Sequence, residues 1–356
     1  MRERLARRAE KDGFVPFDRY MDTVLYDPEV GYYESPRSPL GPSGDFYTAV
    51  HVSPLFARCL SERTRRAREQ LGIGRPFRWV ELGPGDGTLA ATVAGCLAEG
   101  HAPGEVELVL VDRSARRREA ALERVARAVA GTAVSVRAAR SVAELGPFEG
   151  IVVANEVLDA QPVRRFRREA SAWVELGVLL GAGGPTEAFR PAREPPPLLG
   201  EDLPEHADRI VECSPGAEAL VREVADHLVR GVCLLIDYGA EEGELLAAHP
   251  HGTLAAVRGH RALDDPLAEP GGTDLSAFVN FSRVRQAARD AGLSEIAYSS
   301  QAEALGAWGF EKLFAAELAT LRSGEAEVRL RLAAKSLLFG FGSFRVLELA
   351  AGGPAV

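Results

Sequence analysis

The strongest constraint on the fold is a strand-like run that passes directly into a glycine-rich turn, Trp79-Val80-Glu81-Leu82-Gly83-Pro84-Gly85-Asp86-Gly87-Thr88. Further along the chain, apolar runs at 106–111, 134–137, 150–155 and 232–237 alternate with amphipathic helical stretches. This rhythm is typical of a parallel sheet with crossover helices, whose ligands bind beyond the carboxyl ends of the strands. The sequence therefore predicts an α/β fold with a Rossmann-like, doubly wound sheet.

The glycine turn favours S-adenosylmethionine (SAM) over a dinucleotide. Alternate glycines let a ligand approach bare backbone, close to the start of a helix. A dinucleotide fingerprint, G-x-G-x-x-G, needs its third glycine at position 88, where Thr88 stands. Glu81, two residues before the first glycine, suits an amino group better than a pyrophosphate. The predicted cofactor-binding residues of this turn are Glu81, Gly83, Pro84, Gly85 and Gly87.

Acidic and amide side chains follow two later strands. Asp112 ends the second strand, where an acid accepts hydrogen bonds from ribose hydroxyls; the alternative is a helix N-cap. Asn155 and Glu156 follow the fourth strand, and Asp159 would share a face with Glu156 if a helical turn began there. Paired carboxylates suit a guanidinium or amine nucleophile, although Asn155 or Asp159 could instead cap a short helix.

Two segments interrupt the strand–helix rhythm. Residues 164–168 and 173–180 indicate an antiparallel pair, followed by a glycine-rich loop at 181–185 and a proline-rich connection at 191–204. We interpret them as an insertion on the substrate or partner side. The predicted segments are an N-terminal extension (1–60), the first part of the SAM-binding domain (61–162), the insertion (163–205) and the remainder with C-terminal helices (206–356).

Composition limits the class of protein. The net charge of −9 argues against a general nucleic-acid binder, and we interpret the local arginine clusters, such as 164–168, as solvated faces. No apolar run reaches the roughly 18 residues that a membrane span requires. The four cysteines form no C-x-x-C pair, so neither a metal site nor a disulfide framework is expected. We therefore predict a cytoplasmic location.

Several blocks together resemble the MidA-type methyltransferases, the family of the mitochondrial complex I assembly arginine methyltransferase. The resemblance covers roughly positions 15 to 295. It implies a class I SAM-dependent methyltransferase fold, and it implies that a loop formed by Gly44, Asp45 and Phe46 lies over the cofactor. The matching blocks are 25–28, 31–33, 44–46 with Thr48, 81–85, 155–160, 236–239, 252–254 and 270–275.

The chain departs from the family pattern at three positions. Asp112 stands where the family usually has Glu, which keeps the ribose chemistry with a shorter reach. Phe278 and Asn280 replace the His and Asp of a family His-Val-Asp-Phe run. The cofactor assignment is unaffected, but the family's arginine substrate becomes less secure.

We expect a methyltransferase that acts by in-line transfer to a protein side chain, with an arginine nitrogen as the acceptor. Glu156, with Asp159 and Asp45, would orient that nucleophile, while Asn155 and Glu156 also border the cofactor. The alternatives are an O- or N-methyltransferase for a small molecule, a SAM-binding assembly factor without turnover and, third, an NAD oxidoreductase. The sequence leaves open the identity of the acceptor and whether the chain forms a homodimer.

Overall fold

The computed structural model describes residues 1–35, 49–74, 76–98, 104–169, 172–200, 209–259 and 261–352. Two compact units share the chain. The first comprises Met1–Pro39, Leu158–Val221 and Gly239–Ala287, and the second comprises Leu40–Val157, Arg222–Tyr238 and Ala288–Val356. The segment boundaries predicted at 60, 162 and 205 follow the sequence rather than spatial units, and they stay predictions.

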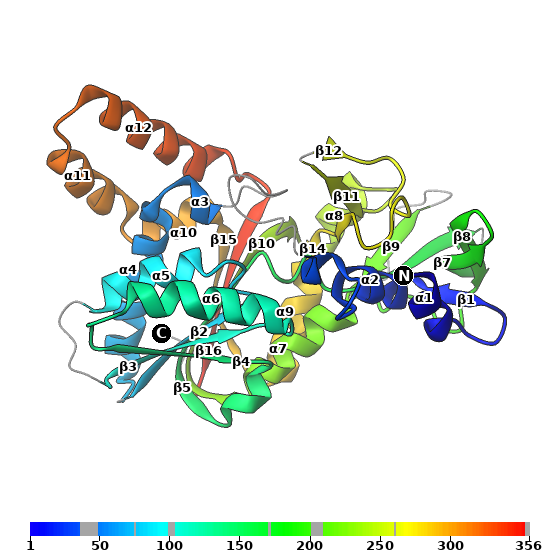
Figure 1. The fold of residues 1–356 in the computed structure, drawn as a ribbon, viewed down its shortest axis with the longest axis horizontal. Helices are drawn as coiled ribbons and strands as arrows, with labels where there is room; N and C mark the ends of the chain where they lie inside the picture. The colour runs from blue at the N-terminus through cyan, green and yellow to red at the C-terminus, as the bar shows by residue number, and fades with distance from the viewer. Residues whose placement is uncertain are drawn as a thin grey trace. The chain divides into compact units, whose positions relative to one another are not determined.

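The second unit is built on the predicted sheet, in the order β15-β16-β10-β5-β2-β3-β4 (Figure 1). The strands from β10 to β4 are parallel, and β16 is antiparallel to both of its neighbours. The chain moves outward from β2 to β4 and then returns to the other side of β2, so the order reverses between β2 and β5. Ligands of doubly wound sheets bind at such a reversal. The strands are β2 (Phe77–Leu82), β3 (Val106–Val111), β4 (Val134–Ala139), β5 (Phe148–Asn155), β10 (Leu228–Ala240), β15 (Ser294–Ser300) and β16 (Phe344–Ala351).

Helices cover this sheet because their apolar residues recur at helical spacing. In α6 (Ala115–Ala128), Ala121 and Val125 are buried, and the chain enters the helix through Ser114, whose Oγ accepts a hydrogen bond from the Arg117 N–H. Trp79 and Leu108 of the sheet belong to the same hydrophobic core. The other helical elements of this unit are α3 (Ala49–Val52), α4 (Pro54–Leu71), α5 (Thr88–Ala98), η2 (Val142–Leu145), α10 (Gln301–Ala307), α11 (Phe310–Thr320) and α12 (Gly324–Phe339).

The first unit contains an antiparallel sheet in the order β1-β7-β6-β9, with β8 also paired to β7. The predicted pair at 164–168 and 173–180 is confirmed as β6 and β7. The loop predicted at 181–185 is shorter in the structure, since Gly181 pairs with Gly184 in a tight hairpin and β8 follows. The left-handed φ of +118° at Gly184 permits this turn. The strands are β1 (Phe14–Pro16), β6 (Arg164–Glu169), β7 (Ala172–Gly181), β8 (Gly184–Pro191) and β9 (Ile210–Cys213).

The first unit has a second hydrophobic core that includes Phe17, Tyr20 and Tyr32. The helix at the start of the chain, Arg2–Arg8, buries Leu5. The helical elements are α1 (Arg2–Arg8), α2 (Phe17–Tyr26), η1 (Tyr32–Glu34) and α8 (Glu242–Ala248), while α7 (Pro215–His227) and α9 (Phe281–Asp290) each begin in this unit. The strands are β11 (Ala255–Arg258), β12 (Arg261–Ala262), β13 (Asp274–Ser276) and β14 (Val279–Asn280).

One arginine cluster is more buried than predicted. Arg164 Nη2 lies 2.8 Å from Glu175 Oε1, and Glu175 is only 1% exposed. Arg165 is also buried, with its Nε 3.2 Å from Glu212 Oε1. The solvated face predicted for 164–168 is therefore wrong at Arg165, which is buried, whereas the Arg164 side chain stays 31% exposed beside its buried partner. In the part of the chain that the structure describes, no helix combines the length and apolarity needed to cross a bilayer.

Candidate cofactor and acceptor site

The glycine turn requires glycine for its backbone conformation. Gly83, Gly85 and Gly87 have φ values of +59°, +56° and +80°, all in the left-handed region. Space is limited as well. A Cβ on Gly83 would lie 2.8 Å from Val157 Cγ2, and one on Gly87 would lie 3.0 Å from the backbone of Ala121. The turn thus leads from β2 into α5 with bare backbone at the end of β2.

Glu81 is buried at that strand end, with 3% of its surface exposed. Burial raises the pKa of Glu81 to about 8, and the nearby charge of Asp86 adds to the rise, while the Ala90 backbone N–H opposes it. Among the described residues, Oε2 of this carboxyl has no hydrogen-bond partner. Buried polar atoms are normally paired, so a ligand ammonium group would complete the site. The residues therefore fit the amino-acid portion of SAM.

Asp112 lies beside the same turn. Gly83 donates its N–H to the carbonyl of Val111 at 2.8 Å, and Asp112 is the next residue after β3. Its Oδ1 accepts the Ser114 N–H at 2.8 Å. The alternative role of Asp112 as a helix N-cap is wrong, since Ser114 caps α6.

The residues after β5 form a strained turn. Glu156 has a φ of +55°, and among the described residues only one other non-glycine residue, Glu269, has a positive φ. Such a conformation costs about 1 kcal/mol or more in a residue with a side chain. Residues 156–160 form bends and turns and no helix, so Glu156 and Asp159 do not share a helical face. Glu156 Oε1 accepts a hydrogen bond from Asn155 Nδ2 at 3.2 Å, whereas Asn155 Oδ1 is buried with no partner among the described residues.

Asp237 supports this turn from the adjacent strand. Its side chain is buried, with Oδ2 3.1 Å from the Val157 N–H nitrogen and Oδ1 2.9 Å from the Tyr238 nitrogen. Glu156 also donates its N–H to the carbonyl of Ile236 at 2.9 Å. Asp237 lies in the family block 236–239, and its pattern alone predicts no role. The available signal was an acid at the end of an apolar strand.

The other predicted site residues divide into two groups. Gly44, Asp45 and Phe46 lie outside the described residues. Asp159 belongs to the first unit, where its carbonyl accepts the Ala277 N–H at 3.0 Å.

The two departures in the 278–281 run have structural roles in the first unit. Asn280 Oδ1 accepts the Arg283 N–H at 3.2 Å in the first turn of α9, and its Nδ2 donates to Glu242 Oε2 at 3.1 Å. The Phe278 ring lies 5.1 Å from the ring of His249. Phe278 therefore packs against His249, and Asn280 caps the start of α9. Neither side chain supplies an acid or base.

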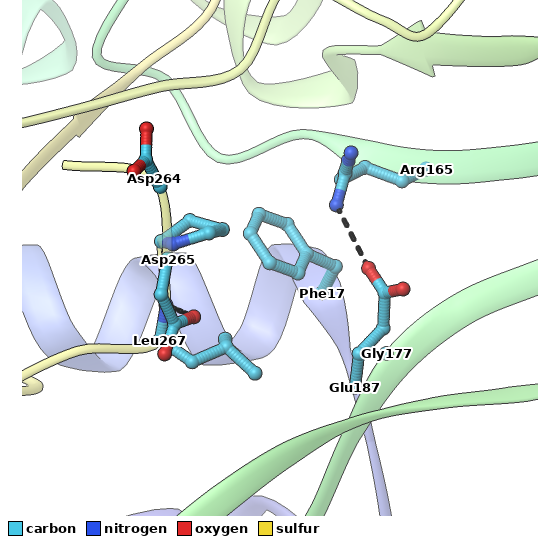
Figure 2. A pocket seen from close by; sticks show the side chains of 8 residues that line it. Phe17, Arg165, Gly177, Glu187, Asp264, Asp265 and Leu267 are labelled. Atoms are coloured by element: carbon cyan, nitrogen blue, oxygen red, sulfur yellow. Dashed lines mark hydrogen bonds and ion pairs between the residues drawn. The ribbon is translucent and has the colours of Figure 1, made fainter. Parts of the chain in front are cut away.

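A cavity of about 290 Å³ in the first unit contains none of the predicted site residues (Figure 2). Arg165 lines it, stacks 5.1 Å from the Phe17 ring centroid and forms ion pairs with Glu187 and Glu212. Its charge is thus already balanced by protein carboxylates. The lining residues are Phe17, Arg165, Gly177, Glu187, Asp264, Asp265, Pro266 and Leu267.

Comparison with known proteins supports the cofactor and the fold. Residues 58–299 match the model of a family described as S-adenosyl-L-methionine-dependent methyltransferase. The mitochondrial protein arginine methyltransferase NDUFAF7 homolog of Drosophila melanogaster is 30% identical, over 79% of this chain and 68% of that protein. The Mus musculus protein arginine methyltransferase NDUFAF7 is 27% identical, over 81% and 70% of the two chains.

A solved structure is similar over the whole chain. It is a protein from Burkholderia thailandensis, described as a methyl transferase and bound to S-adenosyl-homocysteine, with a TM-score of 0.87 and 34% identity. The match covers 100% of this chain and 94% of that chain. The predicted Rossmann-like methyltransferase fold and the predicted SAM cofactor are confirmed.

The same comparisons correct one prediction. The predicted cytoplasmic location is wrong by this measure, because the curated relatives from fly, mouse and human are mitochondrial proteins. The chain belongs to the family of S-adenosyl-L-methionine-dependent methyltransferases and is an enzyme that uses SAM as its methyl donor.

Proposed function

We propose that this enzyme methylates an arginine nitrogen of a protein substrate. The observation that carries the proposal is the strained Glu156, a carboxylate at the end of β5 in a conformation that its side chain disfavours. Backbone strain of this kind concentrates at functional sites. The names of the relatives, which are protein arginine methyltransferases, support the same acceptor.

The residues around the glycine turn would hold the cofactor, which supplies an electrophilic methyl group when bound. Glu81 would accept hydrogen bonds from the ammonium group, and Asp112 would accept them from the ribose. The backbone from Gly83 to Gly87 provides close approach beside the start of α5. Asn155, through its unpartnered Oδ1, would accept a further ligand donor. We also propose that Pro84, Gly44, Asp45 and Phe46 contact the cofactor.

Glu156 would orient the acceptor. A carboxylate forms charge-assisted hydrogen bonds with a guanidinium group, which fixes the direction of the attacking nitrogen. Catalysis then depends on holding the reacting atoms about 3–3.5 Å apart and in line. The same carboxylate stabilises the positive charge that remains on the guanidinium group until its proton leaves. Asp159 and Asp45 are proposed as additional acceptor-side carboxylates.

We predict that SAM binding at pH 7 releases a proton. The pKa of Glu81 is about 8 in the folded protein, so most Glu81 carboxyls are protonated at pH 7, and an ammonium partner favours the ionised form. Calorimetric titrations in phosphate and in Tris should therefore give different binding enthalpies. Glu81→Gln should remove the difference and weaken binding by at least about tenfold. Identical enthalpies in both buffers for the unmodified protein would contradict this role.

The ligand-free protein should also lose stability as the pH rises. The pKa of Glu81 lies above its ordinary value of 4.5, so the folded chain binds more protons than the unfolded chain between these two values. The contribution of Glu81 to the free energy of unfolding therefore falls from pH 4.5 to about pH 8. When Tm is measured from pH 4.5 to about pH 8, the Tm of Glu81→Gln should decline less than that of the unmodified protein. Parallel curves would exclude Glu81 as the cause.

The acceptor class can be tested with methyl-labelled SAM and a cell lysate. If the acceptor is a protein, the label should appear in the macromolecular fraction, and it should remain there after nucleic acid is removed. Label confined to small molecules would favour the metabolite alternative. SAM binding without any labelling would favour an assembly factor.

A further inference from the structure

We propose that Asp237 is a positioning residue for methyl transfer, which holds the turn of Asn155, Glu156 and Val157 in its strained conformation. The inference rests on the proposed role of Glu156 as the acceptor carboxylate. Asp237 acts from the neighbouring strand, since Ile236 of β10 lies opposite Asn155 of β5 in the parallel register.

The hydrogen bonds at this position require an acceptor-only side chain. The two Asp237 oxygens accept the backbone N–H groups of Val157 and Tyr238, at 3.1 and 2.9 Å. The residue is 1% exposed, so water cannot readily replace either bond. An ionised carboxylate accepts at both oxygens, whereas an amide must turn a donor toward one of the two N–H groups. Asp237 therefore fixes the direction of the Val157 N–H.

The orientation of that N–H determines the geometry of the turn. Glu156 donates its own N–H to the Ile236 carbonyl. The next N–H along the chain, that of Val157, donates to the Asp237 carboxylate. The peptide units on both sides of Glu156 are thus anchored to β10. These two anchors stabilise the φ of +55° against its intrinsic cost. Without the second anchor, Glu156 could relax to an ordinary conformation and redirect its carboxylate.

The cofactor turn should tolerate the loss of Asp237. Val157 contacts this turn at Gly83, but Gly83 has its own hydrogen bond to the Val111 carbonyl, at 2.8 Å. Gly87 likewise donates to the carbonyl of Pro84 at 2.8 Å. Asn155, the proposed cofactor ligand of this turn, is held by its own pairing with Ile236 in the β5–β10 ladder. A change at position 237 should therefore affect transfer more than SAM binding.

The test is a double-mutant cycle of Asp237→Asn and Glu156→Gln, with SAM affinity, kcat and Tm measured for each protein. We expect Asp237→Asn to change the Kd for SAM by less than about threefold and to lower kcat by at least about tenfold. Because Asp237 acts through Glu156, the double variant should be no slower than Glu156→Gln alone. If Asp237→Asn does not fold, Asp237→Ser provides the same comparison with a hydroxyl acceptor.

Glu348→Gln is the matched structural control. Glu348 is a buried acid of the same unit that pairs with Arg63 and accepts the Trp308 indole N–H. This variant should lower Tm with kcat preserved. The inference would be overturned if Asp237→Asn lowered Tm but preserved kcat, as expected for Glu348→Gln. It would also be overturned if the losses in kcat from Asp237→Asn and Glu156→Gln multiplied in the double variant. Full activity of Glu156→Gln would instead refute the proposed role of Glu156.

Discussion

Gly85→Val is expected to abolish SAM binding, with a rise in Kd of at least about 100-fold. Gly85 adopts a φ of +56° in the middle of the glycine turn. A β-branched side chain is strained in this region and occupies the space through which a ligand would approach the backbone. Calorimetric titration measures the loss directly, and the circular dichroism spectrum checks that the variant is folded.

Gly131→Val is the matched control for backbone strain. Gly131 also has a positive φ, +77°, but a Cβ there would meet nothing within 4 Å. This variant should lose stability, by about 1–2 kcal/mol, while keeping its affinity for SAM. Retained micromolar binding in Gly85→Val, or an equal loss in Gly131→Val, would refute the placement of the cofactor at this turn.

Glu156→Gly is expected to leave the fold as stable as before, or more stable by about 0.5 kcal/mol, while lowering the rate of methyl transfer by at least about 100-fold. Glycine relieves the left-handed strain, at the cost of a more flexible unfolded chain. The carboxylate that would orient the acceptor is lost, which accounts for the fall in rate. Thermal unfolding and a single-turnover assay with saturating SAM measure the two effects.

Glu269→Gly separates strain from function. Glu269 has a φ of +48° and its side chain is 62% exposed in an ion pair with Arg258. The same substitution there relieves a similar strain at a position with no proposed role, so activity should be unchanged. An active Glu156→Gly enzyme would remove Glu156 from the mechanism. A large drop in its Tm would mean that the side chain stabilises the fold.

The sequence predicted the central sheet well because its strands are buried on both faces. The ranges expected for 106–111 and for the end of the strand at Leu82 agree with β3 and β2. Strand β8 was missed because its sequence, GPTEAFRP, buries only Ala188 and begins in a glycine-rich hairpin. A strand with so little apolar alternation resembles a loop.

The site was predictable where chemistry follows a strand end directly. Glu81 and Asn155 could be placed in this way, because parallel strands present their carboxyl ends at one edge of a sheet. The role of Asp237 was not predictable, since it depends on β10 lying next to β5. Asp237 and Val157, which form a hydrogen bond, are 80 residues apart in the sequence. The left-handed conformation of Glu156 was also hidden, because glutamate has no preference for it.

Amino-acid analysis of the labelled product identifies the residue that accepts the methyl group. Proteins are incubated with the enzyme and methyl-labelled SAM and then hydrolysed, and the labelled amino acids are identified by mass spectrometry. We expect labelled methylarginine with the unmodified enzyme and at least about 100-fold less with Glu156→Gly. Label in any other amino acid, with none in arginine, would contradict it.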